Sequence, residues 1–199
     1  MKKIIITVFL LTTILFGQIK IGTMADVKKF SAIDLHITDY GTSIGWYRQF
    51  APMGRFHFGF WANITMVTGG DEYTIRDYWG REYKINEISL EFLKSGFSIK
   101  YHLFKGKLAN TFSPFFATQI GGILAIDTPE NTEFFEKYKS IDLYYGLSNN
   151  YYVGIDFMGS PKYEISVAVG YETNYLNAEV DGDKNWYGKA VYFQYGKFF

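Results

Sequence analysis

The feature of this sequence that most constrains the fold is a hydrophobic alternation with a period of two residues. Successive side chains of a β-strand point to opposite faces of a sheet, whereas a helix repeats every 3.6 residues. The alternation recurs in 30–38, 84–94, 97–105 and 163–173, and it is longest in 55–67. There one face carries Phe56, Phe58, Phe60, Ala62, Ile64 and Met66, and the other carries His57, Gly59, Trp61, Asn63 and Thr65. The sequence therefore predicts an all-β chain.

The composition agrees with strands and excludes several classes of function. A chain of 199 residues is the length of a single domain. Aromatic residues make up 20% of the chain and only 4 residues are proline, which favours strands. The absence of cysteine excludes disulfides, thiolate metal sites and a cysteine nucleophile. The 20 basic and 20 acidic residues cancel, so no net field attracts nucleic acid and we expect no nucleic-acid partner.

Residues 1–22 are expected to be a secretory signal peptide, and 23–199 the mature domain. Lys2 and Lys3 precede an apolar run from Ile4 to Gly17 that only threonines interrupt. This run is shorter than the roughly 20 residues that a membrane-spanning helix needs, and it suits a signal sequence. Cleavage sites between 17/18 and 25/26 are compatible with the sequence. A buried N-terminal helix or a retained anchor is the alternative.

Alternating strands suit either a soluble sheet around an apolar core or a transmembrane barrel in contact with lipid. Two features favour the barrel. The polar face carries charges and small residues, as a barrel lumen does, and the strands average near the 10 residues that cross a bilayer at a tilt of about 45°. In the alternative, a soluble sandwich or lipocalin-like barrel, the Phe and Ile face would form the interior.

The chain ends in an alternating aromatic strand, Tyr192-Phe193-Gln194-Tyr195-Gly196-Lys197-Phe198-Phe199. In this segment the sequence resembles the small outer-membrane β-barrel proteins of Gram-negative-type bacteria, whose last strand commonly ends in Phe and is read by the assembly machinery. The matching residues are Val191, Phe193, Tyr195 and Phe199, whereas Lys197 replaces the usual apolar residue. The resemblance implies a location in the outer membrane, periplasmic termini, and contact with outer-membrane lipid and the barrel assembly machinery.

Turn lengths favour a closed antiparallel barrel of ten strands, with eight as the alternative. The ten expected strands are 30–38, 42–50, 55–67, 84–94, 97–105, 113–126, 138–148, 151–158, 163–173 and 186–199. Fusing 30–50 and 138–158 into single strands gives eight. The lumen of such a barrel is only wide enough for side chains, so we expect a filled polar interior and no wide pore.

Pairing of the expected strands predicts three cross-strand contacts on the lumen face. Pairing Phe50 with Phe56 places the Tyr47 ring opposite Gly59, which fills a narrow interior. A turn at 95–96 would set Glu91 opposite Lys100 and Ser89 opposite His102, with Glu87 nearby.

The residues around the turn at 95–96 have two interpretations. Ser89, His102 and Glu91 contain the groups of a nucleophile, base and orienter, as in a lipid-modifying hydrolase of the lipid A deacylase type. Glu87, Glu91, Lys100 and His102 otherwise form an interior network of paired charges. We favour the network and expect no enzyme, because Ser89 points into the lumen and away from acyl chains.

Metal and cofactor signals are weak. Asp181 and Asp183 could hold Ca²⁺ through oxygen ligands, and a solvated turn explains them equally well. His36 and His57 face the lumen without ligand spacing to another histidine or carboxylate. No nucleotide, phosphate or zinc motif is present, so we expect no cofactor.

Loop 68–83 is the most informative exposed segment. Its Tyr73, Arg76, Tyr78 and Trp79 are residue types that carry binding energy at interfaces, which suggests an extracellular ligand. Alternatively the two flanking strands continue past the membrane and these rings form its interfacial aromatic girdle, the interpretation that we favour. The sequence thus predicts a structural or surface-interaction role, with the hydrolase and a narrow channel as alternatives.

Overall fold

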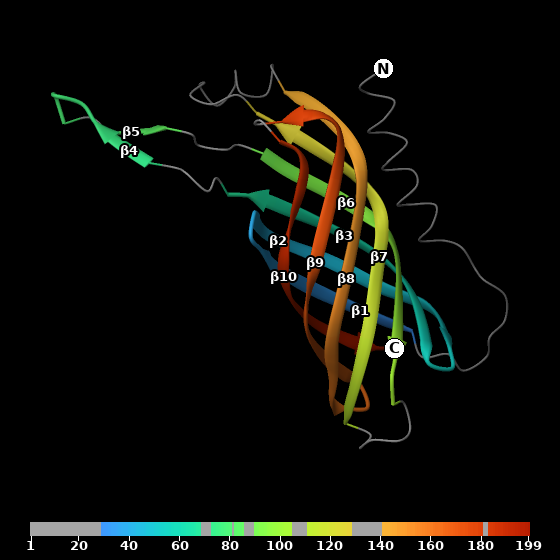
Figure 1. Ribbon diagram of the computed structural model, residues 1–199. Coiled ribbons are helices and arrows are strands. Elements are labelled where there is room, and N and C mark those ends of the chain that lie inside the picture. The colour runs from blue at the N-terminus through green and yellow to red at the C-terminus, as the bar shows by residue number, and fades with distance from the viewer. Residues whose placement is uncertain are drawn as a thin grey trace.

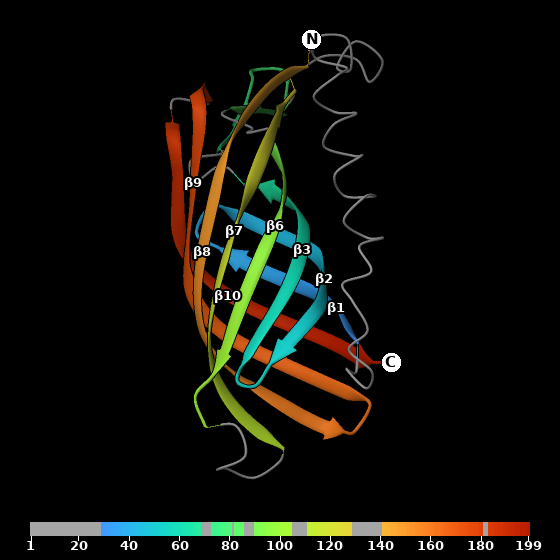
Figure 2. The same ribbon diagram turned by 90° about the vertical axis from the view of Figure 1, so that its right-hand side faces the viewer.

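The computed structural model describes residues 29–68, 73–80, 82–85, 90–104, 111–128, 141–180 and 183–199. Eight strands form a closed antiparallel barrel, and two short strands form a separate sheet (Figures 1 and 2). The barrel strands are β1 (Phe30–Thr38), β2 (Gly41–Met53), β3 (Phe56–Val67), β6 (Leu90–His102), β7 (Phe112–Asp127), β8 (Asp142–Ser160), β9 (Tyr163–Val180) and β10 (Asp183–Phe198). The separate sheet pairs β4 (Tyr73–Arg76) with β5 (Glu82–Ile85). The expected signal peptide, 1–22, lies outside the described residues.

The closed antiparallel barrel is confirmed, but its eight strands do not support the expectation of ten. Residues 142–148 and 151–158 belong to one strand, β8, as the eight-strand alternative expected. Segments 84–94 and 97–105 do not form a hairpin, because β6 runs through the expected turn at 95–96. In contrast, 30–50 remains two strands, β1 and β2.

Gly96 explains why β6 stays extended. It pairs with Gly121 of β7, and a Cβ on either glycine would collide with the backbone of the opposite strand. Among the described glycines, only Gly54 and Gly80 have the positive φ that a tight hairpin turn favours. The glycine at 96 therefore serves the close approach of two strands, and the two expected strands are one.

The two longest connections between barrel strands, 68–89 and 128–141, lie at the same end of the barrel. We call the end where Phe30 pairs with Phe198 the terminus end, and the opposite end the loop end. A tight turn joins β2 to β3 at the terminus end, and another joins β8 to β9 there. The hairpin of β4 and β5 stands away from the barrel at the loop end (Figure 1).

The two faces of the strands are those that the alternation predicted for most of the chain. In β3, Trp61 and Thr65 are buried in the lumen, at 1% and 0% exposure, while Met66 is exposed on the outside. The part of 84–94 that lies in β6 is reversed, because Leu90 and Phe92 face the lumen and Glu91 faces outward. Because β6 is one continuous strand, its even-numbered residues face the lumen along its whole length, as Lys100 does.

The register of β2 on β3 also differs from the prediction. A bulge at Phe50 shifts the pairing, so that Tyr47 lies directly opposite Trp61 and Gln49 opposite Gly59. The Tyr47 ring nevertheless covers Gly59 diagonally, and a Cβ at Gly59 would collide with it. The expected packing of a ring over a glycine is therefore present with a different direct partner.

An apolar band surrounds the outside of the barrel. On β9, Tyr163 and Tyr175 both point outward, and Val169, 62% exposed, lies midway between them. At about 3.3 Å per residue and a tilt near 40°, the two tyrosines lie about 30 Å apart along the barrel axis. This separation matches an apolar band with an aromatic girdle at each edge. In the described part of the chain, no helix is long and apolar enough to cross a lipid bilayer.

The position of Val169 gives a test of this band. We expect Val169→Arg to lower the free energy of unfolding by roughly 2–4 kcal/mol, because the guanidinium would lie at the bilayer midplane. Asn185→Arg, an exposed position near the loop end of β10, should cost about 0–1 kcal/mol. Urea unfolding in phospholipid vesicles measures both. Equal losses in the two variants would contradict this position of the band.

Candidate functional site

The lumen is filled by side chains arranged in layers. Apolar side chains close the loop end, namely Tyr40, Val67, Leu90, Phe92, Ile123, Ala125, Leu176, Val180 and Trp186. A smaller apolar cluster closes the terminus end, with Phe30, Ala32, Tyr47 and Trp61. Buried charged and polar residues lie between these two layers and are the candidate functional site.

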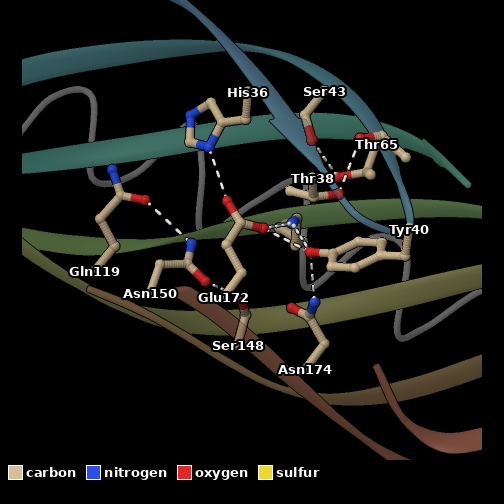
Figure 3. Close-up of polar contacts among 12 residues, drawn as sticks. His36, Thr38, Tyr40, Ser43, Thr65, Gln119, Ser148, Asn150, Glu172 and Asn174 are labelled. Carbon is tan, nitrogen blue, oxygen red and sulfur yellow. Dashed lines mark hydrogen bonds and ion pairs between the residues drawn. The ribbon is translucent and has the colours of Figure 1, made fainter. Parts of the chain in front are cut away.

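The Glu172 carboxylate is the centre of the main polar cluster (Figure 3). Its Oε2 accepts hydrogen bonds from Lys94 Nζ at 2.9 Å and from the Tyr40 hydroxyl at 2.6 Å. Its Oε1 accepts a hydrogen bond from the Tyr152 hydroxyl and lies 2.9 Å from His36 Nδ1. Each oxygen thus has two partners, which is what a fully buried carboxylate needs in place of water.

These partners come from walls on different sides of the barrel. His36 belongs to β1, Lys94 to β6 and Tyr152 to β8, while Tyr40 projects inward from the turn after β1. In the ring of strands, β1 and β6 lie on opposite sides of β9, which carries Glu172. The contacts of Glu172 with His36 and Lys94 therefore connect β9 to two strands with which it shares no backbone hydrogen bonds.

A second cluster is centred on Asp156 of β8. Lys100 Nζ donates to both of its carboxylate oxygens, at 3.0 and 3.2 Å, and His102 Nε2 lies 2.7 Å from Oδ2. The Lys100 ammonium also lies 3.7 Å from Glu164 and donates to the Ser166 hydroxyl at 3.4 Å. Both clusters therefore pair each buried lysine with a carboxylate.

The second cluster contains a histidine–carboxylate pair but no activated nucleophile among the described residues. His102 Nε2 is occupied by Asp156, and His102 Nδ1 has no hydrogen-bond partner in the described part of the chain. The Ser166 hydroxyl interacts with Lys100 and Gln194 instead. A serine hydrolase needs its serine hydrogen-bonded to the histidine.

The residues predicted around the turn at 95–96 are dispersed. Lys100 and His102 lie in the lumen, at 5% and 4% exposure, but Glu91 is exposed on the outside of β6. Because β6 is continuous, Glu91 and Lys100 lie about 30 Å apart along one strand and do not face each other. Glu87 and Ser89 lie outside the described residues.

The predicted calcium site has no support in the described residues. Asp183 is exposed at the start of β10, and Asp181 lies outside the described residues. The described part of the chain contains no group of three or more His, Asp or Glu placed to hold a metal ion.

Sequence reasoning missed the centres of both lumen clusters. The alternation in 163–173 placed Glu164 and Glu172 on the polar face, so the inward direction of both side chains could be predicted. The partners in the two clusters could not be predicted, because the sequence did not establish the register and the inward face of the strands that carry Asp156 and Lys94.

The predicted exposed loop contains the β4–β5 hairpin. Tyr78 and Trp79 lie in its connecting turn, at 96% and 81% exposure, and their rings meet edge to face at 5.8 Å. Asp77 organises the turn, because its Oδ1 accepts from Trp79 N at 2.8 Å and its carbonyl accepts from Gly80 N at 3.0 Å. Gly80 has a φ of 80°, as such a turn favours. Arg76 is exposed at the end of β4, and Tyr73 begins that strand.

The residues of the predicted assembly signal lie in a row on the outside of the barrel. Val191, Phe193 and Tyr195 are 38%, 42% and 56% exposed on β10, and Phe199 follows at 71%. The Phe199 N–H donates to the Lys29 carbonyl at 2.8 Å, so the last residue is held beside the start of β1.

Glu172→Gln tests the central position of this carboxylate. The change leaves Lys94 as a buried charge without its counter-ion, and we expect a loss of roughly 3–5 kcal/mol in the free energy of unfolding. The double variant Lys94→Met/Glu172→Leu should recover much of this loss, because it removes both charges.

The matched control is Glu179→Gln, the same change on the exposed part of the same strand, which should alter stability by less than about 0.5 kcal/mol. Urea unfolding in vesicles measures all three variants. A Glu172→Gln barrel as stable as the control would show that the cluster does not hold the barrel together.

Comparison with solved structures identifies the fold. No protein-family model matches the sequence, and no curated protein matches it. The structure is similar to that of Neisserial surface protein A, with a TM-score of 0.57 and 10% identity over 86% of this chain and 95% of that one. It is also similar to the N-terminal β-barrel domain of Pseudomonas aeruginosa OprF, with a TM-score of 0.51 and 10% identity over 86% and 97%. The resemblance inferred from the last strand is thus confirmed, and the chain has the fold of the small outer-membrane β-barrel proteins.

Proposed function

We propose that this protein is a non-enzymatic, non-conducting barrel of the bacterial outer membrane that presents the β4–β5 hairpin to a binding partner outside the cell. The observation that carries the proposal is the exposure of Tyr78 and Trp79 in the turn of that hairpin. In this orientation the terminus end lies in the periplasm and the loop end outside, as in barrels with short periplasmic turns.

The hairpin turn has the properties of a binding surface. Tyr and Trp bury 150–250 Å² each at an interface, and with Arg they are the residues that most often dominate binding energy. The hydrogen bonds of Asp77 and the backbone of Gly80 fix the turn in advance, which lowers the entropic cost of binding. An aromatic girdle is the weaker interpretation, because β4 and β5 pair with each other as a separate sheet and do not extend barrel strands.

The packed lumen supports a scaffold in preference to a channel. Leu90, Phe92 and Ala125 are at most 2% exposed at the loop end, where an ion would have to enter. The buried ion pairs further in join strands that are not neighbours in the sheet, so a continuous water path would require them to separate.

The lumen also argues against the lipid-modifying hydrolase. His102 and Asp156 point into the barrel, whereas acyl chains contact its outside. No described serine is hydrogen-bonded to His102, and Ser89 lies outside the described residues. We therefore place the function at the exposed hairpin.

Adhesion of expressing bacteria tests the proposed function. We expect cells that display this protein to bind at least one surface in a panel of purified matrix proteins and immobilised glycans. Tyr78→Ser/Trp79→Ser should reduce that binding at least tenfold, because it removes the exposed rings and leaves the turn-forming Asp77 and Gly80.

The control for adhesion is Tyr187→Ser, which removes an exposed ring from the outside of β10 and should leave binding unchanged. A gel shift between unboiled and boiled samples confirms that each variant forms a closed barrel. Absence of binding to the whole panel, or full binding by the double variant, would contradict the proposal.

Conductance tests the closed lumen. Reconstituted in planar bilayers beside a general porin, this protein should produce no unitary current steps, because side chains fill its interior. Reproducible steps from purified protein would favour the narrow channel instead.

A further inference from the structure

In the described residues of the barrel, exposed acidic side chains lie only at the loop end. Among the described residues at the terminus end, the exposed charged side chains are all basic: Lys29, Arg48, Arg55, Lys162 and Lys197. The described acidic side chains at that end, Asp156 and Glu164, are buried in the lumen. The loop end carries exposed acids, namely Asp39, Glu91, Asp142, Glu179 and Asp183, together with Lys184 and Lys189.

Four of the basic residues gather around the end of β10. Ser31 of β1 pairs with Arg48 of β2 on one side and with Lys197 of β10 on the other, so the two cations occupy one row on the outer face. At about 4.8 Å between strands, their Cα atoms lie about 10 Å apart. The Lys29 and Lys162 carbonyls accept hydrogen bonds from Phe199 N and Phe198 N, both at 2.8 Å, which places these lysines beside the same strand end.

These four cations, which we call the basic cluster, have no carboxylate side chain as a partner in the described part of the chain. Among the described residues, no such group lies within ion-pair distance of any of them. Their positive charges are therefore available to a ligand from outside the described part of the chain.

Aromatic rings place the basic cluster at the depth of lipid headgroups. The Lys197 ammonium lies 5.3 Å from the Phe199 ring centre and 6.0 Å from that of Tyr163. Tyr163 stacks on Tyr195 at 5.9 Å, and both rings are exposed at the edge of the apolar band. Tyrosines in this position lie at the membrane–water interface.

We propose that the basic cluster binds the phosphate groups of anionic glycerophospholipids in the leaflet at the terminus end. Several exposed cations at headgroup depth, next to an apolar band that contacts the acyl chains, match both parts of such a lipid. Arg48 adds a planar guanidinium, which binds phosphate through two parallel hydrogen bonds. The proposal also gives a role to Lys197, the residue that departs from the usual pattern of the last strand.

Trp46 provides a direct measurement of this lipid. It is the tryptophan that faces outward from the barrel wall, 39% exposed and two residues from Arg48 on the same face of β2. Lipids with dibrominated acyl chains quench tryptophan on contact. In vesicles, dibrominated phosphatidylglycerol should quench wild-type fluorescence more than dibrominated phosphatidylcholine at the same mole fraction, with an association preference of roughly fivefold or more.

A set of variants tests whether the lipid preference depends on the basic cluster or on the total charge of the protein. Arg48→Gln/Lys197→Gln should lower the preference to near one, and Lys29→Gln/Lys162→Gln should lower it in part. Lys184→Gln/Lys189→Gln removes the same charge from the loop end and should leave the preference unchanged. High salt should reduce the wild-type preference without any substitution.

The outcomes that overturn the proposal are equally direct. They are a wild-type protein that is quenched equally by both lipids, or a preference that survives Arg48→Gln/Lys197→Gln. An equal loss in Lys184→Gln/Lys189→Gln would also overturn it. The hairpin takes no part in this measurement, so its result is independent of the proposed adhesive function.

Discussion

Closure of the sheet on itself is the constraint on which the rest of this structure depends. Hydrocarbon offers no hydrogen bonds to backbone N–H and C=O groups, so a sheet in a bilayer has no tolerable free edge. Here β1 pairs with β10 over its whole length, from Phe30 with Phe198 to Thr38 with Ala190. With eight strands this closure leaves an interior just wide enough for side chains.

That narrow interior determines the chemistry of the lumen. Apolar layers at both ends remove the buried charges from water, and an unpaired charge there would be costly. Glu172 forms an ion pair with Lys94, and Asp156 forms one with Lys100, so each of these two buried lysines has a carboxylate partner. The same pairs connect walls that share no backbone hydrogen bonds. The barrel therefore offers a rigid support, and the structure leaves its exposed hairpin and its outer surface free to interact.

The sequence predicted what depends on alternation within one strand. The inward and outward faces of 55–67 and 163–173 follow from the pleat alone, and so does the outward row that ends at Phe199. The predicted number of strands was wrong at two places, because β8 runs through 149–150 and β6 runs through Ser95-Gly96. Ser95-Gly96 has the composition of a turn but serves the close contact of Gly96 with Gly121. The predicted outward direction of Leu90 and Phe92 was wrong, because apolar residues also fill the loop end of the lumen.

The lumen site depends on contacts that no local pattern encodes. His36 and Glu172 are 136 residues apart, and their meeting requires the correct strand number and every register between them. The bulge at Phe50 alone shifts one of those registers. The hairpin was partly predictable, because the interleaved rings and charges of 73–79 indicated an exposed segment. Whether those rings form a girdle or an exposed turn depends on whether the strands beside them join the barrel.

The central claim is that one face of each strand contacts lipid while the other encloses a closed lumen. Because the chain has no cysteine, single cysteines can be introduced one at a time along β9 from Glu164 to Thr173 and spin-labelled in vesicles. Collision with molecular oxygen, which concentrates in lipid, should be high at odd positions such as 165, 167 and 169 and low at even positions such as 166 and 168. Oxygen accessibility without this alternation, or highest at the even positions, would contradict the account.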